Sequence, residues 1–209
     1  MVYHAREKTP LGIKEAKIKF IVDVATKLFL ERGIFAVTMR DIAKEAELGE
    51  ATLYRYFSRK QNLVVAAAMK LENEVFRQYF SLVGQNGFEK LQSFYFAYLK
   101  VFEKHAEYYK FVSEFDFYVA SVDVDLSGYE KSLFPYYEQY LSAYESGVAD
   151  GTVKKVADVE VYYLTTTHAL ISLCKKLTVS GDILSQDKYG AEEVATLVGI
   201  ILSDLNLRV

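Results

Sequence analysis

The sequence predicts an all-α protein of about nine helices. Three observations carry that prediction. Apolar residues recur three and four positions apart along most of the 209 residues, as in amphipathic helices. Only 2 prolines interrupt the chain, and no segment alternates polar and apolar residues for long enough to predict a strand. Hydrophobic residues make up 51% of the chain, which excludes intrinsic disorder.

The first element is a flexible arm followed by an amphipathic helix. Residues 1–12 lack periodicity and contain Pro10 and Gly12, so they are expected to form the arm. The helix begins near Ile18 and ends at Gly33, a residue typical of the position after a helix. Its inward face is Ile18, Ile21, Val22, Ala25, Leu28 and Phe29.

Two short helices follow. Thr38 and Asp41 have the spacing of a capping box and open the first, which ends before Gly49. The second, over residues 50–57, turns Leu53 and Phe57 inward. The inward face of the first is Ile42, Ala43 and Ala46.

Longer helices make up the rest of the chain. Ser58 and Gln61 have the spacing of a second capping box, which predicts a long helix to about residue 82. Aromatic-rich helical stretches then cover residues 88–104, 106–121, 127–149, 158–179 and 190–206. Pro135 lies inside one of them and is expected to kink it.

Charge is distributed unevenly. Residues 1–60 contain 12 Lys and Arg against 8 Asp and Glu, whereas the remaining 149 contain 13 against 20. A basic N-terminal end on an acidic body favours a polyanion as the partner of that end.

A helix-turn-helix motif is predicted where the two short helices pack on the first helix. Ala25–Gly33, Thr38–Ala46 and Ala51–Leu63 together resemble the TetR family of bacterial transcriptional regulators, over about residues 13–68. The rest of the chain resembles that family in length, helix content and the turn at Ala149–Thr152. The resemblance implies a DNA-binding domain over residues 1–60 and an effector-binding and dimerisation domain over residues 61–209.

The resemblance also implies which residues contact double-stranded DNA. Arg55 is suited to guanine in the major groove, whereas Tyr56 and Lys60 are suited to phosphates. Glu50 reads cytosine or is merely solvated, and Tyr54 is either a contact or a core residue. The implied contacts are Thr38, Arg40, Glu50, Ala51, Thr52, Tyr54, Arg55, Tyr56 and Lys60.

Two positions depart from the family pattern. Many relatives have glycine where this chain has Glu47, and serine or threonine where it has Gly49. Gly49 remains an acceptable N-cap but brings no hydroxyl to a phosphate.

The C-terminal part is unusually aromatic. Of 31 aromatic residues, 24 lie beyond residue 70, and so many tyrosines are hard to satisfy in a dry core. The family implies a cavity for a small effector, here an apolar or aromatic one. A core built from Phe and Tyr explains any single residue better, and only the excess of tyrosines taken together favours the cavity. The candidates are Tyr98, Phe102, Phe115, Tyr118, Tyr137, Tyr140, Tyr163 and Thr167.

The last two helices are apolar on most sides, which predicts burial by a second copy. The family likewise implies a homodimer through these helices. Its two recognition helices would then lie about 34–36 Å apart on a near-palindromic operator.

No catalytic set, metal site or cofactor motif is found. Cys174 and His168 lie in an apolar helix and are expected in the core. The single cysteine and the polar N-terminus without a signal peptide predict a cytoplasmic protein. The function expected is a sequence-specific regulator, most simply a repressor released by its effector, and no enzyme. The alternative is a TetR-like interaction module or coactivator that binds a partner protein and not DNA.

Overall fold

A computed structural model describes residues 10–180 and 189–207 of the chain. Within these ranges the protein consists of helices, with one isolated β-bridge between Val153 and Asn206. The prediction of an all-α fold is therefore confirmed. The helices are α1 Pro10–Arg32, α2 Met39–Glu45, α3 Glu50–Tyr56, α4 Lys60–Tyr79, α5 Gly87–Lys104, α6 Ala106–Ala120, α7 Ser127–Ala149, α8 Val159–Ser180 and α9 Gly190–Leu205.

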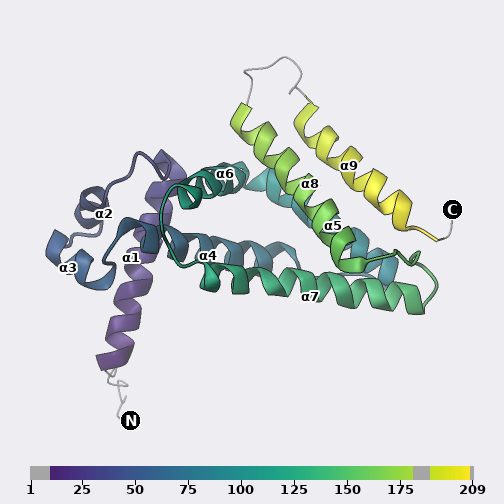
Figure 1. The fold of residues 1–209 in the computed structure, drawn as a ribbon, viewed down its shortest axis with the longest axis horizontal. Helices are drawn as coiled ribbons and strands as arrows, with labels where there is room; N and C mark the ends of the chain where they lie inside the picture. Colours follow the sequence, from purple (N-terminus) through teal and green to yellow (C-terminus); the bar gives the residue numbers. More distant parts are fainter. Residues whose placement is uncertain (1–9, 181–188, 208–209) are drawn as a thin grey trace, which may run out of the picture.

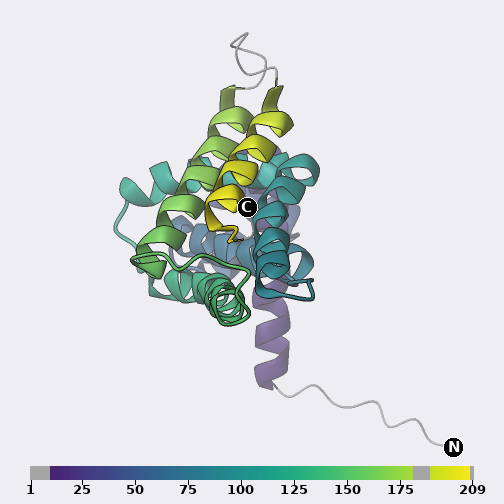
Figure 2. The same cartoon turned by 90° about the vertical axis from the view of Figure 1, so that its right-hand side faces the viewer.

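The small N-terminal helices and the C-terminal helix pair lie at opposite ends of the molecule (Figure 1). Helix α1 packs on α4 and α6, whereas α5 packs on α7 and α9. Helices α8 and α9 run side by side (Figure 2). As a result, α4 and α6 are the elements that join the N-terminal helices to the larger helical body.

The core has two parts. One cluster contains the inward faces of α1, α2 and α3, together with Leu63–Leu71 of α4 and Phe111, Phe115 and Tyr118 of α6. The other contains the inner faces of α5, α7, α8 and α9. The predicted domain boundary after residue 60 falls at the start of α4, whose first turns pack in the N-terminal cluster.

Two predicted helix starts are wrong. Helix α1 begins at Pro10 rather than near Ile18, since proline is tolerated in the first turn and Gly12 does not interrupt the helix. Residues 1–9 of the expected arm lie outside the described residues. Helix α4 has Arg59 as its N-cap with no side-chain hydrogen bond, so Ser58 and Gln61 do not form a capping box. The helix ends at Tyr79, three residues earlier than expected.

The turn between α2 and α3 has a strained backbone at Glu47, the position where many relatives have glycine. Thr38 and Asp41 form the predicted capping box of α2. Glu47 then has a φ of +52°, a left-handed conformation that glycine adopts more easily. Gly49 has a φ of −67° and caps α3 without needing its conformational freedom.

Candidate functional site

The helix-turn-helix presents a polar surface at the end of the molecule. Leu53 is fully buried and anchors α3, while Tyr54 is 47% exposed, so the core interpretation of Tyr54 is wrong. Phe57 is only half-buried. Arg55 is exposed and its guanidinium lies 5.7 Å from the centre of the Tyr56 ring. Of the nine predicted contacts, Thr38, Arg40, Glu50, Ala51, Tyr54 and Arg55 are exposed, and Thr52, Tyr56 and Lys60 are half-buried.

Glu50 faces a basic residue across the turn. Its Oε1 lies 3.8 Å from Nε of Arg40, and both side chains are mostly exposed. An exposed pair of this kind contributes little stability. It does, however, place opposite charges side by side at the starts of α2 and α3.

Lys60 occupies a different place from the open phosphate site that its sequence position implies. Its Nζ donates a hydrogen bond of 2.5 Å to the carbonyl of Ile34 and lies 5.4 Å from the centre of the Tyr118 ring. Burial lowers the pKa of Lys60. The backbone N–H of Ile34 donates to Oε2 of Glu114 at 2.5 Å. Both polar groups of Ile34 are thus held, one by α4 and one by α6.

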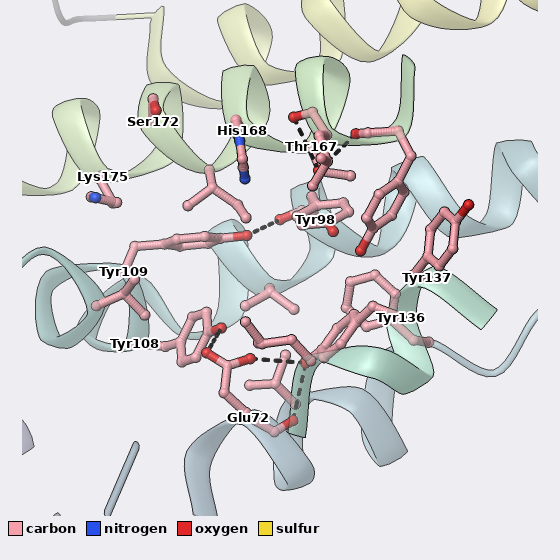
Figure 3. Close-up of a pocket in the computed structure, with 18 of the residues that line it drawn as sticks. Glu72, Tyr98, Tyr108, Tyr109, Tyr136, Tyr137, Thr167, His168, Ser172 and Lys175 are labelled. Carbon is pink, nitrogen blue, oxygen red and sulfur yellow. Dashed lines mark hydrogen bonds between the residues drawn. The ribbon is translucent and has the colours of Figure 1, made fainter. Parts of the chain in front are cut away.

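The helical body contains a cavity of about 660 Å³ between α4, α5, α6, α7 and α8. This volume is within the range of small-molecule sites. Four predicted residues line it, namely Tyr98, Tyr137, Tyr163 and Thr167. Figure 3 shows Tyr98 and Thr167 on one side of the cavity and Tyr136 and Tyr137 on another.

The other four predicted residues do not line this cavity. Phe115 and Tyr118 lie on the face of α6 that packs in the N-terminal core, and not on the face that lines the cavity. Tyr140 is fully buried against the rings of Phe94 and Tyr95. Phe102 contacts the Tyr109 ring and lies beside the start of α9. These residues share helices with the cavity but face in other directions.

Glu72 on α4 is the main cavity residue that sequence reasoning missed. It is 5% exposed, and its carboxylate accepts hydrogen bonds from Tyr108 at 2.7 Å and Tyr136 at 3.2 Å. Tyr129 adds a longer contact of 3.5 Å. Burial raises the pKa of Glu72, and the tyrosine hydroxyls oppose that shift. The signal in the sequence was its spacing, since Glu72 lies four residues after Ala68 and three before Val75, on the apolar face of the helix.

Helix α8 forms a more polar wall. His168 and Ser172 are exposed and line the cavity, so the expectation of a core histidine is wrong. Lys175 pairs with Asp116 of α6 at this side of the cavity. Cys174 is fully buried, as expected, and burial raises the pKa of its thiol to about 12.

Other kinds of site find no support in the part of the chain that the structure describes. No group of three His, Cys, Asp or Glu side chains there is placed to hold a metal ion. Each helix in the described ranges is too short or too polar to cross a membrane.

An exposed helix-turn-helix with hydroxyl and basic side chains defines the class of helix-turn-helix DNA-binding proteins. The comparisons give the family. Residues 21–67 match the family model described as "Bacterial regulatory proteins, tetR family". The chain is 25% identical over 194 residues to the HTH-type transcriptional repressor KstR2 of Mycolicibacterium smegmatis, a match that covers 86% of this chain and 87% of that protein.

Solved structures agree on the fold. A TetR-family regulator from Marinobacter aquaeolei has a TM-score of 0.63 and 18% identity, over 94% of this chain and 98% of that one. The structure of KstR2 from Mycobacterium tuberculosis, titled a ketosteroid transcriptional regulator, has a TM-score of 0.57 and 21% identity, over 91% and 95%. Residues 21–67 therefore match the TetR family, and the described helices share the fold of its solved members. The helix-turn-helix and the matched repressor indicate a DNA-binding transcriptional regulator, and the matched proteins are regulators and not enzymes.

Proposed function

We propose that the chain is a dimeric repressor that leaves a near-palindromic operator when a small apolar effector occupies the cavity. One observation carries the proposal. Helices α4 and α6 pack against the N-terminal helices that form the helix-turn-helix domain, and the same two helices also line the aromatic cavity. The curated relative matched over most of its length is a repressor, which supports the direction of control.

In this proposal α3 enters the major groove. Glu50, Ala51, Thr52, Tyr54 and Arg55 lie in or along the groove, and Arg55 pairs with guanine. The remaining predicted contacts, Thr38, Arg40, Tyr56 and Lys60, bind phosphate or adjoining bases. Because Glu50 lies near Arg40, it also limits how closely phosphate approaches that guanidinium.

The proposed dimer forms through α8 and α9. Ile200 is 62% exposed, and with Leu173 and Leu197 it lines a shallow groove between these helices. Gly199 has open space beside it, which allows a second helix to approach closely. A second copy placed here would complete a four-helix bundle.

The effector would act through α6. This helix lines the cavity with Tyr108 and Tyr109 and holds the α1–α2 loop through Glu114. An effector shifts the equilibrium between a DNA-binding state and a released state only if its affinity for the two states differs. A ligand that favours a displaced α6 would therefore move the loop at Ile34 and change the distance between the two recognition helices.

The first experiment selects operator DNA from a random library and then measures affinity as salt is varied. Tyr54→Ala and Arg55→Ala should each weaken operator binding by about 1–3 kcal/mol. Lys100→Ala, at an exposed lysine of α5 remote from the motif, is the control. Unchanged affinity in both variants would contradict the proposal.

Lys60 needs its own readout, since it also holds Ile34. Loss of a phosphate contact reduces the slope of log affinity against log salt by about 1. Loss of the Ile34 contact alone would weaken binding without that change in slope. Lys60→Ala is expected to change both, and an unaltered slope would remove Lys60 from the phosphate contacts.

A protein-binding module without DNA affinity remains the second candidate, and Glu50 is the observation that favours it. A carboxylate at the start of α3 repels phosphate unless it meets a cytosine amino group. Failure of the chain to retain any sequence from the library, together with co-purification of one regulator, would favour this candidate over the first.

A further inference from the structure

The floor of the cavity contains a buried carboxylate with no positive partner. The carboxylate of Glu72 accepts hydrogen bonds from the hydroxyls of Tyr108, Tyr129 and Tyr136, and the Tyr136 hydroxyl also donates to the Glu72 backbone carbonyl. Among the described residues, no Lys, Arg or His forms an ion pair with Glu72. A buried carboxylate is normally paired, because its isolated charge is costly in a low-dielectric site.

The rest of the described lining is mainly acidic and aromatic, and its basic residues are His168 and Lys175. Asp116, Glu130 and Glu160 also line the cavity, and Lys175 is its single lysine, already paired with Asp116. Nine aromatic rings complete the walls, and the face of each ring carries partial negative charge.

The wall beside Glu72 is built from these rings. The centre of the Phe80 ring lies 4.7 Å from that of Tyr136 and 5.0 Å from that of Tyr98, in edge-to-face contacts. Figure 3 shows Tyr108 and Tyr136 on either side of Glu72, with Tyr98 above them towards α8. A ligand in this space meets ring faces and edges on several sides and the carboxylate at one end.

We infer that the effector is a lipophilic organic cation, an ammonium or phosphonium compound whose positive group lies against Glu72 and the surrounding rings. The inference rests on the proposed function, since it concerns the ligand of the same cavity. The cation supplies the charge that Glu72 lacks, while its apolar substituents fill the aromatic walls. A neutral apolar ligand would leave the carboxylate unpaired, and an anion would be repelled by it.

The test compares two probes of nearly the same shape and opposite charge, tetraphenylphosphonium and tetraphenylborate. Isothermal calorimetry on the full chain should give at least about tenfold tighter binding of the phosphonium. Glu72→Gln keeps the size of the side chain and one of its two acceptor oxygens, removes the negative charge, and should lose most of that preference. Glu145→Gln, at an exposed acid of α7 outside the cavity, should keep it.

Equal binding of the two probes, tighter binding of the borate, or an unchanged preference in Glu72→Gln would overturn the inference. Circular dichroism checks that the variant folds, and the comparison of probes on the unaltered chain stands without it.

A neutral dye such as Nile red separates this inference from the proposed function. Binding of the dye, lost in Leu164→Trp at the exposed rim of the cavity, with no preference for the phosphonium would leave the effector cavity in place and overturn the cation alone. If neither dye nor phosphonium binds while the chain still binds operator DNA, the effector part of the proposed function fails as well.

Discussion

At the scale of single residues, the turn of the helix-turn-helix stores strain at Glu47. A φ of +52° costs a non-glycine residue about 1–2 kcal/mol. Glycine would remove that cost, but it would also lose more conformational entropy on folding, which offsets part of the gain. Glu47→Gly should therefore raise the free energy of unfolding by about 0.5–1 kcal/mol, as measured by urea denaturation.

The reciprocal substitution provides the control. Gly151 has a φ of +72° and no atom within 4 Å of an added Cβ, so strain alone decides the outcome. Gly151→Ala should lower stability by about 1 kcal/mol. A loss of stability in Glu47→Gly would show that the glutamate side chain contributes more than the strain costs.

The buried carboxyl of Glu72 predicts a stability that depends on pH. Its pKa is raised above the ordinary value of 4.5, so folding favours the protonated form and the folded chain loses stability as pH rises above that value. Glu72→Gln resembles the protonated form. We expect the variant to melt at a higher temperature than the unaltered chain at pH 7, with the difference shrinking towards pH 4.5 and below.

Comparing the unaltered chain with Glu72→Gln cancels the contribution of every group whose titration does not depend on Glu72. Several other titratable groups face Glu72. They are Tyr108 and Asp116 of α6, Tyr129 and Tyr136 of α7, and Tyr98 and Tyr163 of α5 and α8. Asp116 is the other carboxylate of this group, so Asp116→Asn is the matched control. A stability difference that grows on acidification would contradict a raised pKa.

At the scale of elements, the bounds of the long helices were largely predictable from the sequence. Which face of each helix packs against which neighbour was not. Five long helices begin and end within two residues of their sequence-based bounds, because each has an apolar stripe and a break of glycine or charge. Helix α6 shows where prediction fails. It is apolar on two faces, one towards the cavity and one towards the N-terminal core, and the sequence does not say which face meets which partner.

The same limit explains the cavity. Phe115 and Tyr118 lie on the face of α6 that packs in the N-terminal core. Glu72 lines the cavity, but its spacing on α4 does not show that this part of the helix borders a cavity. The residues predicted to contact DNA lie together in one short segment, because the spacing of the motif fixes their positions, and six of the nine are exposed. Lys60 is the exception: its contacts with Ile34 and Tyr118 depend on helices distant in sequence.

Helix α6 also holds the α1–α2 loop through Glu114, so removing that side chain should release the loop from the helix. Ile34 is fully buried, so Glu114→Ala would leave its N–H without an acceptor and lower stability by about 1–3 kcal/mol. Hydrogen exchange of the peptide covering residues 30–37 should become faster. Glu114→Gln retains an acceptor oxygen and should exchange nearly as the unaltered chain does. Equal protection in all three proteins would mean that this contact does not hold the loop.

At the scale of the whole molecule, a single motif reads only one half of a palindromic site. Joining two half-site readers raises overall affinity by about 10²–10⁴, so operator binding depends on the dimer. The exposed face of α8 and α9 lies at the end of the molecule opposite the motif (Figure 1). Subunits joined there would leave both α3 helices free to bind DNA.

Ile200→Asp tests that arrangement. Its side chain is 62% exposed in the single chain, so aspartate should not disturb the fold but would bury a charge between subunits. Sedimentation should show a monomer, with operator affinity reduced about 100-fold or more. Phe117→Asp, at a residue of α6 that is 72% exposed, should remain dimeric and bind DNA as before. A dimeric Ile200→Asp protein would place the subunit interface elsewhere, whereas a monomer with full affinity would show that one helix-turn-helix suffices.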